Sequence, residues 1–294
     1  MTVAEAGPAV SVRGLRKNFG DSDVLEVVEF DADEGEITLL MGPNGVGKTI
    51  LLSCLAGGLQ ASEGDISVLG DHPEATKERL SFMLQDTMLV DELTGRENVA
   101  FFRDLHPRST DGVESVLDRL DFEVDALGRE VRDYSGGMKR KLELAISLNV
   151  DAPLFLLDEP TAALDMTTVE TLHSLLAARR DAGETIILSS HLPGDADLAD
   201  RIVVLTEDGV SAVGSPEDLL AEVPPVVLVE GPGDVSESVR DGRLFEGEIH
   251  RRGFLRADRD PGAVTDNTDG TAIQVRDPSY TDMFNYYVHL RGNQ

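Results

Sequence analysis

A glycine-rich loop between a predicted strand and a predicted helix constrains the fold of this chain more than any other segment. The strand is the apolar run Ile37–Met41, and the helix is expected over residues 48–56. The loop has the spacing G-x-x-x-x-G-K-[ST], which in this context indicates a phosphate-binding loop. Its residues are Gly42, Pro43, Asn44, Gly45, Val46, Gly47, Lys48 and Thr49. The pattern favours an α/β nucleotide-binding fold over a chance glycine-rich turn.

The residue types in this loop suit a triphosphate. The glycines let successive backbone N–H groups point into one concavity, and the helix N-terminus adds positive potential there. Lys48 supplies a point charge for the β- and γ-phosphates, and the Thr49 hydroxyl can bind Mg²⁺. The loop by itself predicts only that the chain binds a nucleoside triphosphate.

Two adjacent carboxylates follow a second buried-type strand. The apolar residues 154–157 lead into Asp158 and Glu159. The carboxyl end of a parallel strand lies where ligands bind, beside the phosphate-binding loop. Asp158 is placed to hold Mg²⁺, usually through water, and Glu159 to polarise the attacking water. Two carboxylates near a triphosphate imply a metal between them; the alternative is a charged turn that merely ends the strand.

Two further segments carry candidate phosphate contacts. Residues 135–137, Ser-Gly-Gly, open a basic helical stretch whose free N–H groups and dipole favour an anion. This stretch is too far along the chain from Thr49 to join the same cradle by local folding. The predicted strand 186–190 ends at His191, and an isolated histidine there is most simply interpreted as a satisfied turn residue.

Taken in order, these motifs resemble the nucleotide-binding subunits of ATP-binding cassette (ABC) transporters. Residues 42–49 match the Walker A motif of that family, residues 154–159 its Walker B motif, and residues 135–137 its signature motif. Gln85 matches the Q-loop glutamine, and His191 matches the switch histidine. Residues 163–165 match the D-loop, and Phe19 matches the aromatic residue that stacks on adenine. The resemblance covers roughly residues 9–222 and extends to the single-cassette, drug- or multidrug-exporter-like subgroup.

The resemblance implies an ATPase whose P-loop cassette has a mixed-sheet core and an inserted helical subdomain at about residues 86–150. ATP would lie between the Walker A motif of one cassette and the signature motif of another, in a homodimer or a cassette heterodimer closed by ATP. Catalysis is assigned to Glu159, His191 and Gln85, and Mg²⁺ to Thr49, Gln85 and Asp158. The residues assigned to the nucleotide are Phe19, Gly42, Pro43, Asn44, Gly45, Val46, Gly47, Lys48, Thr49, Ile50, Ser135, Gly136, Gly137 and Asp165.

A membrane partner is also implied by the resemblance. Members of the family drive a separate integral membrane permease, and residues 87–103 are the candidate docking region. No apolar run reaches the roughly 18 residues that a spanning helix needs, and residues 1–6 lack the features of a secretory signal. We therefore expect a cytoplasmic chain that is peripheral on the inner face of the cell membrane. The transported substrate and the direction of transport are not predicted, since specificity lies in the membrane subunit.

Three positions depart from the family pattern. Ile50 stands where a second Thr or Ser commonly contacts the α-phosphate, so that hydroxyl is missing. Tyr134 and Met138 replace the usual Leu and Gln of the signature motif, and the second change puts a polar contact in doubt. Lys48 and Glu159 are unchanged, so a working ATPase is still expected.

The charge of the chain is strongly negative. Its 294 residues include 55 Asp and Glu against 26 Lys and Arg, a formal net charge of −29. Such a surface repels phosphate backbones, which disfavours nucleic acid as a partner. It also repels itself unless salt screens it. We interpret the composition as a halophilic acidic surface, adapted to a salt-rich cytoplasm; the alternative is an ordinary acidic protein.

Residues 223–294 carry no chemical motif and are expected to form a small accessory α+β domain after the cassette at residues 1–222. Strands are predicted at residues 226–229 and 271–275 and an amphipathic helix at 280–290, with Arg251 and Arg252 as a solvated pair. The domain would serve dimerisation or docking.

Other ATPase classes with the same fold fit less well. A translation-type cassette ATPase needs two cassettes, and a chromosome- or repair-type ATPase needs a long coiled coil or zinc-binding cysteines. This chain has one phosphate-binding loop and the single cysteine Cys54. The remaining alternative is a single-cassette soluble regulatory ATPase that acts on a non-membrane partner.

Overall fold

The computed structural model describes residues 7–231, 237–245, 250–259 and 272–291. Residues 1–6, on which the expectation of no secretory signal depends, lie outside this part of the chain. The chain divides into two compact units, Met1–Val213 and Gly214–Gln294, each of which is described by itself. The division falls before the sequence-based boundary at residues 222/223, because the short helix at residues 216–221 groups with the second unit.

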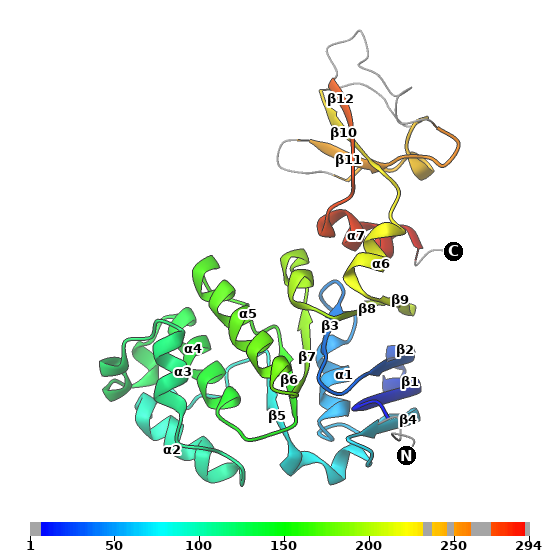
Figure 1. Ribbon diagram of the computed structural model, residues 1–294. Coiled ribbons are helices and arrows are strands. Elements are labelled where there is room, and N and C mark those ends of the chain that lie inside the picture. The colour runs from blue at the N-terminus through cyan, green and yellow to red at the C-terminus, as the bar shows by residue number, and fades with distance from the viewer. Residues whose placement is uncertain (1–6, 232–236, 246–249, 260–271, 292–294) are drawn as a thin grey trace, which may run out of the picture. The chain divides into compact units, whose positions relative to one another are not determined.

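A six-stranded sheet forms the centre of the first unit (Figure 1), with the order β5-β6-β7-β3-β8-β9. The strands from β5 to β8 in that order pair in parallel. Every residue of β3, β6 and β7 is buried, as expected for parallel strands covered on both faces. The predicted strands at residues 37–41, 154–158 and 186–190 are thereby confirmed. The bounds are β3 (Ile37–Met41), β5 (Leu80–Met83), β6 (Leu154–Asp158), β7 (Thr185–Ser190), β8 (Arg201–Thr206) and β9 (Gly209–Gly214).

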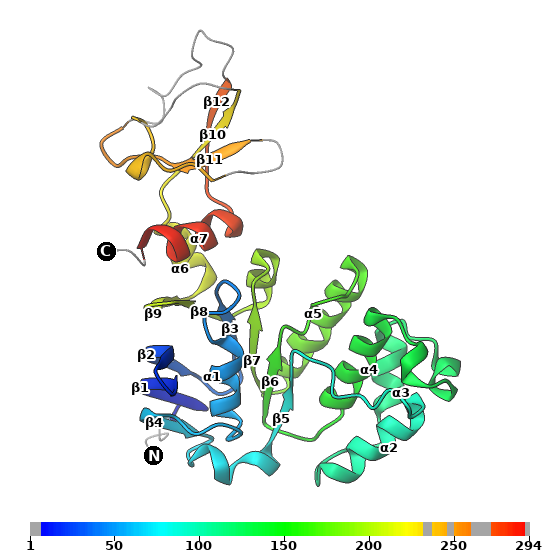
Figure 2. The same cartoon turned by 180° about the vertical axis from the view of Figure 1, so that it is seen from behind.

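An antiparallel sheet of order β2-β1-β4 lies on the other side of α1 (Lys48–Leu55), which Figure 2 shows between the two sheets. Its strands are β1 (Val10–Phe19), β2 (Ser22–Ala32) and β4 (Glu63–Val68). Leu51, Leu52 and Leu55 of α1 join apolar side chains of both sheets in one core. The helix therefore holds the phosphate-binding loop rigidly against two sheets.

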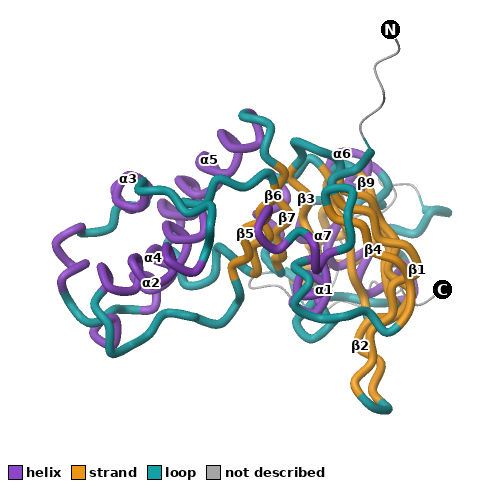
Figure 3. Tube along the Cα trace, turned by 90° about the horizontal axis from the view of Figure 1, so that it is seen from below, coloured by secondary structure: helices purple, strands orange, loops and turns teal. Residues whose placement is uncertain are grey.

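A helical lobe is inserted between β5 and β6, which confirms the predicted helical subdomain. It contains α2 (Gly95–Leu105), α3 (Val113–Arg119) and α4 (Gly136–Leu148), with 3₁₀-helices at Val124–Gly128 and Val131–Asp133. The lobe has its own core, centred on Leu117, Leu127 and Leu142. Figure 3 shows this lobe and the antiparallel sheet at opposite ends of the first unit.

Helix starts in this unit are set by capping side chains. Thr94 and Glu97 form a capping box at the start of α2, and Ser135 caps α4. Asp165 caps α5 (Met166–Asp181) in the same way. Short 3₁₀-helices at Pro73–Ala75, Lys77–Arg79 and Pro193–Leu198 complete the unit.

The second unit is a small α+β fold, as the sequence predicts. Its antiparallel sheet has the order β11-β10-β12. The elements are α6 (Pro216–Ala221), β10 (Val226–Glu230), a 3₁₀-helix at Arg240–Gly242, β11 (Arg251–Phe254), β12 (Ala272–Arg276), α7 (Tyr280–Tyr286) and a π-helical turn at Tyr287–Arg291.

The expectation that Arg251 and Arg252 form a solvated pair is wrong. Both lie in β11, where Arg252 contacts the buried carboxylate of Asp282 at 3.2 Å and Arg251 donates to the carbonyl of Gly231. Arg252 therefore pairs with a carboxylate of α7, a partner that is distant in the sequence and that no local pattern shows.

Candidate functional site

The phosphate-binding loop leaves β3 at Met41 and enters α1 at Lys48. Two of its glycines are required by geometry. A Cβ on Gly42 would lie 2.5 Å from the carbonyl oxygen of Leu205. Gly47 has φ +94°, and a Cβ there would lie 2.5 Å from the side chain of Leu25. Glycine is therefore needed both for close packing and for the left-handed turn into the helix.

Lys48 lies across the mouth of this loop. Its buried ammonium donates to the carbonyls of Gly42 at 2.7 Å and Pro43 at 3.0 Å. It is also 4.0 Å from a carboxylate oxygen of Glu159. Burial lowers the pKa of Lys48, and the negative charges of Glu159 and Asp158 oppose that shift. Lys48 thus links the loop to the carboxylates at the end of β6.

Asp158 is fully buried, and its two oxygens differ. Oδ1 accepts a hydrogen bond from the hydroxyl of Ser189, whereas Oδ2 is buried without a hydrogen-bond partner among the described residues. Burying an unpartnered carboxylate oxygen is costly. Its chemistry suits a hard cation, which takes oxygen ligands.

Two of the predicted catalytic side chains contact the carboxylate of Glu159. Gln85 Nε2 donates to its Oε2 at 3.3 Å, and His191 Nδ1 lies 3.2 Å from its Oε1. Thr49 in turn donates to Gln85 Oε1 at 3.4 Å. Residues far apart in the sequence therefore form one polar network beside the phosphate-binding loop.

A second group of predicted residues lies elsewhere. Ser135 caps α4 by accepting from the N–H of Met138, and Asp165 caps α5 by accepting from Thr168. A Cβ on Gly137 would lie 3.2 Å from the carbonyl oxygen of Ala163, so the Ser-Gly-Gly turn and residues 163–165 are neighbours. Figures 1 and 2 show α4 and α5 on the side of β6 and β7 away from α1. The helices that these residues cap therefore lie across β6 and β7 from the helix that follows the phosphate-binding loop.

Hydrogen bonds to Thr168 hold the pKa of the Asp165 carboxyl below its usual range, so Asp165 stays ionised as a helix cap. Phe19 is about half exposed at the end of β1, with the ammonium of Lys17 4.7 Å from its ring centroid. Ile50 is half-buried and packs against the core shared by the two sheets.

Ser189 and Arg140 belong to this site and carry no sequence motif. The Ser189 hydroxyl donates to Asp158 and accepts from the Glu159 N–H at 3.0 Å. The Arg140 guanidinium donates to the carbonyls of Asp158 and Glu159. Two features of the sequence could have indicated these residues. Ser189 is a small polar residue in a mostly apolar strand, and Arg140 is a basic residue on a mostly buried face of a helix.

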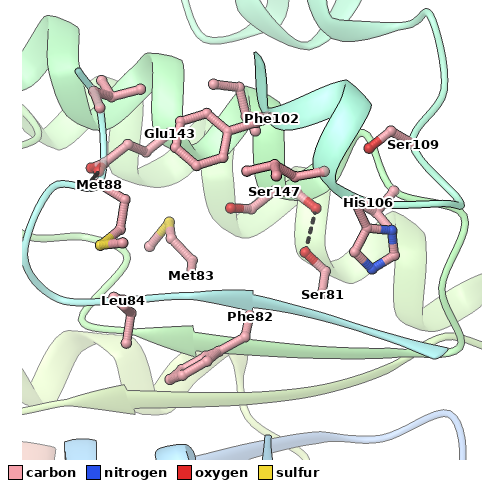
Figure 4. Close-up of a pocket in the computed structure, with 14 residues that line it drawn as sticks. Ser81, Phe82, Met83, Leu84, Met88, Phe102, His106, Ser109, Glu143 and Ser147 are labelled. Atoms are coloured by element: carbon pink, nitrogen blue, oxygen red, sulfur yellow. Dashed lines mark hydrogen bonds between the residues drawn. The ribbon is translucent and has the colours of Figure 1, made fainter. Parts of the chain in front are cut away.

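An apolar cavity of about 220 Å³ lies beside the Gln85 segment (Figure 4). It is lined from β5 by Met83, from α2 by Phe102 and Leu105, and from α4 by Glu143. Met88 and Leu105, which also line the cavity, are exposed apolar residues, and Phe101 is another on α2. Among the described residues, no helix combines the length and the apolar character that crossing a bilayer requires.

Comparisons with known proteins agree on one family. The family model described as "ABC transporter" matches residues 25–162. The daunorubicin resistance ATP-binding protein DrrA3 of Streptomyces coeruleorubidus is 31% identical, covering 98% of this chain and 97% of its own. A sulfate/thiosulfate import ATP-binding protein of Mycobacterium tuberculosis is 33% identical over 90% of this chain and 76% of its own. The Nod factor export ATP-binding protein I of a Rhizobium species is 35% identical over 73% of each chain.

Solved structures show the same fold. The ATP-binding subunit of an ABC transporter has a TM-score of 0.65 at 26% identity, covering 73% of this chain and 92% of that one. A dimeric ATP-binding cassette bound to ADP and Pi in a post-hydrolysis state has a TM-score of 0.63 at 24% identity, covering 70% of this chain and 98% of that one.

Proposed function

Because the chain belongs to the ATP-binding cassette (ABC) transporter family, we propose that it binds and hydrolyses ATP to drive a separate membrane-spanning subunit. The end-to-end similarity to a drug resistance protein supports an exporter-type system. Importer subunits are similar over nine-tenths of the chain, so the direction of transport rests on the partner.

The catalytic assignment rests on one arrangement: Gln85 and His191 both contact the carboxylate of Glu159, which lies beside Lys48. In this arrangement Glu159 accepts a proton from the attacking water, and His191 and Gln85 orient the water and the γ-phosphate. Lys48 and the loop N–H groups neutralise the phosphate charge. Phe19 stacks on the adenine.

The residues present also fit Mg²⁺. Mg²⁺ at a nucleotide is usually held by one or two protein carboxylates together with substrate phosphates and several waters. The buried Oδ2 of Asp158 provides an oxygen without a competing donor, and Thr49 and Gln85 add theirs. Bound Mg²⁺ would neutralise charge on the β- and γ-phosphates.

We further propose that Ser135, Gly136 and Gly137 bind the ATP held by a second cassette, a homodimer partner or a related chain. This assignment is supported by the position of α4, whose N-terminus they form, on the other side of β6 and β7 from α1. Asp165, next to this end, would lie at the seam. ATP binding then adds contacts that exist only in the closed dimer, so binding energy drives closure.

The direct test of catalysis is Glu159→Gln. Removing the general base should lower turnover by about 10²–10⁴-fold and leave ATP binding intact, measured by phosphate release and by titration calorimetry. Glu184→Gln is the matched control, because Glu184 pairs with Arg179 at the opposite end of β7 from His191. Wild-type hydrolysis in Glu159→Gln would remove Glu159 from the role of base.

The helical lobe is the proposed docking site of the permease, in the region of residues 87–103 and the adjoining cavity. Met88 and Leu105 are 58% and 63% exposed, and together with Phe101 they give the lobe an apolar surface. A short helical segment from the cytoplasmic face of a permease suits such a surface, since an amphipathic helix lays its apolar face into a hydrophobic groove. Docking there would hold the cassette at the inner face of the membrane.

The alternative function is a soluble regulatory ATPase whose partner is not a membrane protein. It would use the same catalytic network, so the network does not separate the two. The similarity to import and export ATP-binding proteins, over 90% and 73% of this chain, favours the transporter. We assign nucleotide binding to the cassette and an accessory role to the C-terminal unit.

A further inference from the structure

Arg140 joins two segments that carry the catalytic side chains. It lies on α4, one turn after the Ser-Gly-Gly sequence, with only 5% of its surface exposed. One guanidinium nitrogen donates to the carbonyls of Leu84 at 3.2 Å and Gln85 at 3.4 Å. The other donates to the carbonyls of Asp158 at 3.2 Å and Glu159 at 2.5 Å.

This bridge depends on the shape of the side chain. A guanidinium presents five N–H donors in a fixed planar fork, so one residue can hold carbonyls from two segments. A lysine ammonium is a point charge on a flexible stem and cannot span both pairs with the same geometry. The bridge therefore requires the guanidinium of an arginine at position 140 and not only a positive charge.

Glu143, one turn further along α4, also contacts the segment that carries Gln85. Its Oε1 accepts from the N–H of Met88 at 2.9 Å, and its Oε2 lies 3.5 Å from Arg140. Figure 4 shows Glu143 reaching from α4 toward the segment that carries Met88. Helix α4 therefore contacts this segment at Leu84 and Gln85 through Arg140, and at Met88 through Glu143.

The backbone of Glu159 makes this contact important for catalysis. Glu159 has φ +48°, a left-handed conformation that a residue with a Cβ adopts only at a cost. Two side chains hold it there: Ser189 accepts from its N–H, and Arg140 donates to its carbonyl. The direction of the Glu159 carboxylate consequently depends on where α4 places Arg140.

We infer that Arg140 is a positioning residue that ties the helix bearing the Ser-Gly-Gly end to both Glu159 and Gln85. A nucleotide from a second cassette that engages this end of α4 then acts on Glu159 and Gln85 of the same chain through Arg140. This inference rests on the proposed function, because it assigns Arg140 to the hydrolysis step.

The test compares Arg140→Lys with the wild type. A carboxylate misplaced by about 1 Å can cost about 10²-fold in rate, so kcat should fall by roughly that factor while the Kd for ATP stays unchanged. Arg140→Gln is the second variant if the lysine form does not fold. Arg179→Lys is the matched control, since Arg179 also donates to a main-chain carbonyl and pairs with a carboxylate, Glu184.

A double variant separates positioning from a general structural role. If Arg140 acts through Glu159, adding Arg140→Lys to Glu159→Gln should lower the residual turnover no further, because residues that act as a unit are not additive. Equal kcat in Arg140→Lys and wild type, or additive losses in the double variant, would overturn the inference. Absence of hydrolysis in the wild type would instead overturn the proposed function.

Discussion

Glu159 is held in a left-handed backbone conformation at the end of a buried strand, with Lys48, Gln85 and His191 around its carboxylate. Strain of this kind persists only where the surroundings impose it, and it is concentrated at functional sites. In this conformation the carboxylate lies 4.0 Å from the ammonium of Lys48 in the phosphate-binding loop. Single residues in this site are therefore defined by their neighbours as much as by their own chemistry.

The sequence predicted the residues with distinctive side chains in distinctive spacings, and the structure brings Thr49, Gln85, Glu159 and His191 together. It did not predict Arg140 or Ser189. Arg140 donates to main-chain carbonyls, and Ser189 accepts from one N–H besides donating to Asp158. Any backbone offers carbonyl and N–H groups, so no spacing of residue types reveals those contacts. The roles of Phe19 and Asp165 remain predictions, because each depends on a ligand or a second cassette.

Ile50 provides a test of the predicted contact to the α-phosphate. Ile50→Thr restores a hydroxyl near the expected α-phosphate, so ATP and ADP should bind more tightly by up to about 1 kcal/mol, one ordinary hydrogen bond. Titration calorimetry measures this change directly. Thermal unfolding is the companion measurement, because Ile50 packs against the core and its loss should lower Tm. Unchanged or weaker binding would mean that the loop N–H groups already satisfy the α-phosphate.

The elements were predicted well where burial is complete. The strands β3, β6 and β7 are each built around a run of apolar residues, and the structure places them side by side in the parallel sheet. The order β6-β7-β3 follows from long-range pairing, which no local pattern encodes. The predicted helix at residues 280–290 begins as α7 but changes to a π-helical turn at Tyr287, whose hydroxyl donates to Leu219 of α6. That change follows from packing within the second unit.

Helix α4 connects the functions of the helical lobe. The Ser-Gly-Gly turn lies at its N-terminus, Arg140 donates to the carbonyl of Glu159 at the end of β6, and Glu143 lines the apolar cavity beside α2. A rigid element with three such contacts suits the transmission of nucleotide binding to a docked partner. The sequence predicted the lobe but not that one helix makes all three of these contacts.

The charge of the whole molecule sets its response to salt. At a net charge of −29, acidic self-repulsion should destabilise the folded chain at low ionic strength. The Debye length falls from about 10 Å at 0.1 M to about 3 Å at 1 M salt. We predict that Tm and the ATPase rate rise as KCl increases over this range. Equal stability and activity in dilute buffer would contradict a salt-adapted surface.

The most direct test of the transporter assignment is capture from native membranes with the intact chain as bait. We predict that one membrane-spanning protein co-purifies, and that Leu105→Glu, which places a charge on the apolar surface of the helical lobe, releases it. Basal ATP hydrolysis should be unchanged, because Leu105 lies outside the catalytic network. Val213→Glu, at another exposed apolar residue, should leave capture intact. If no membrane-spanning protein follows the intact chain, the transporter function is contradicted and the soluble regulator takes its place.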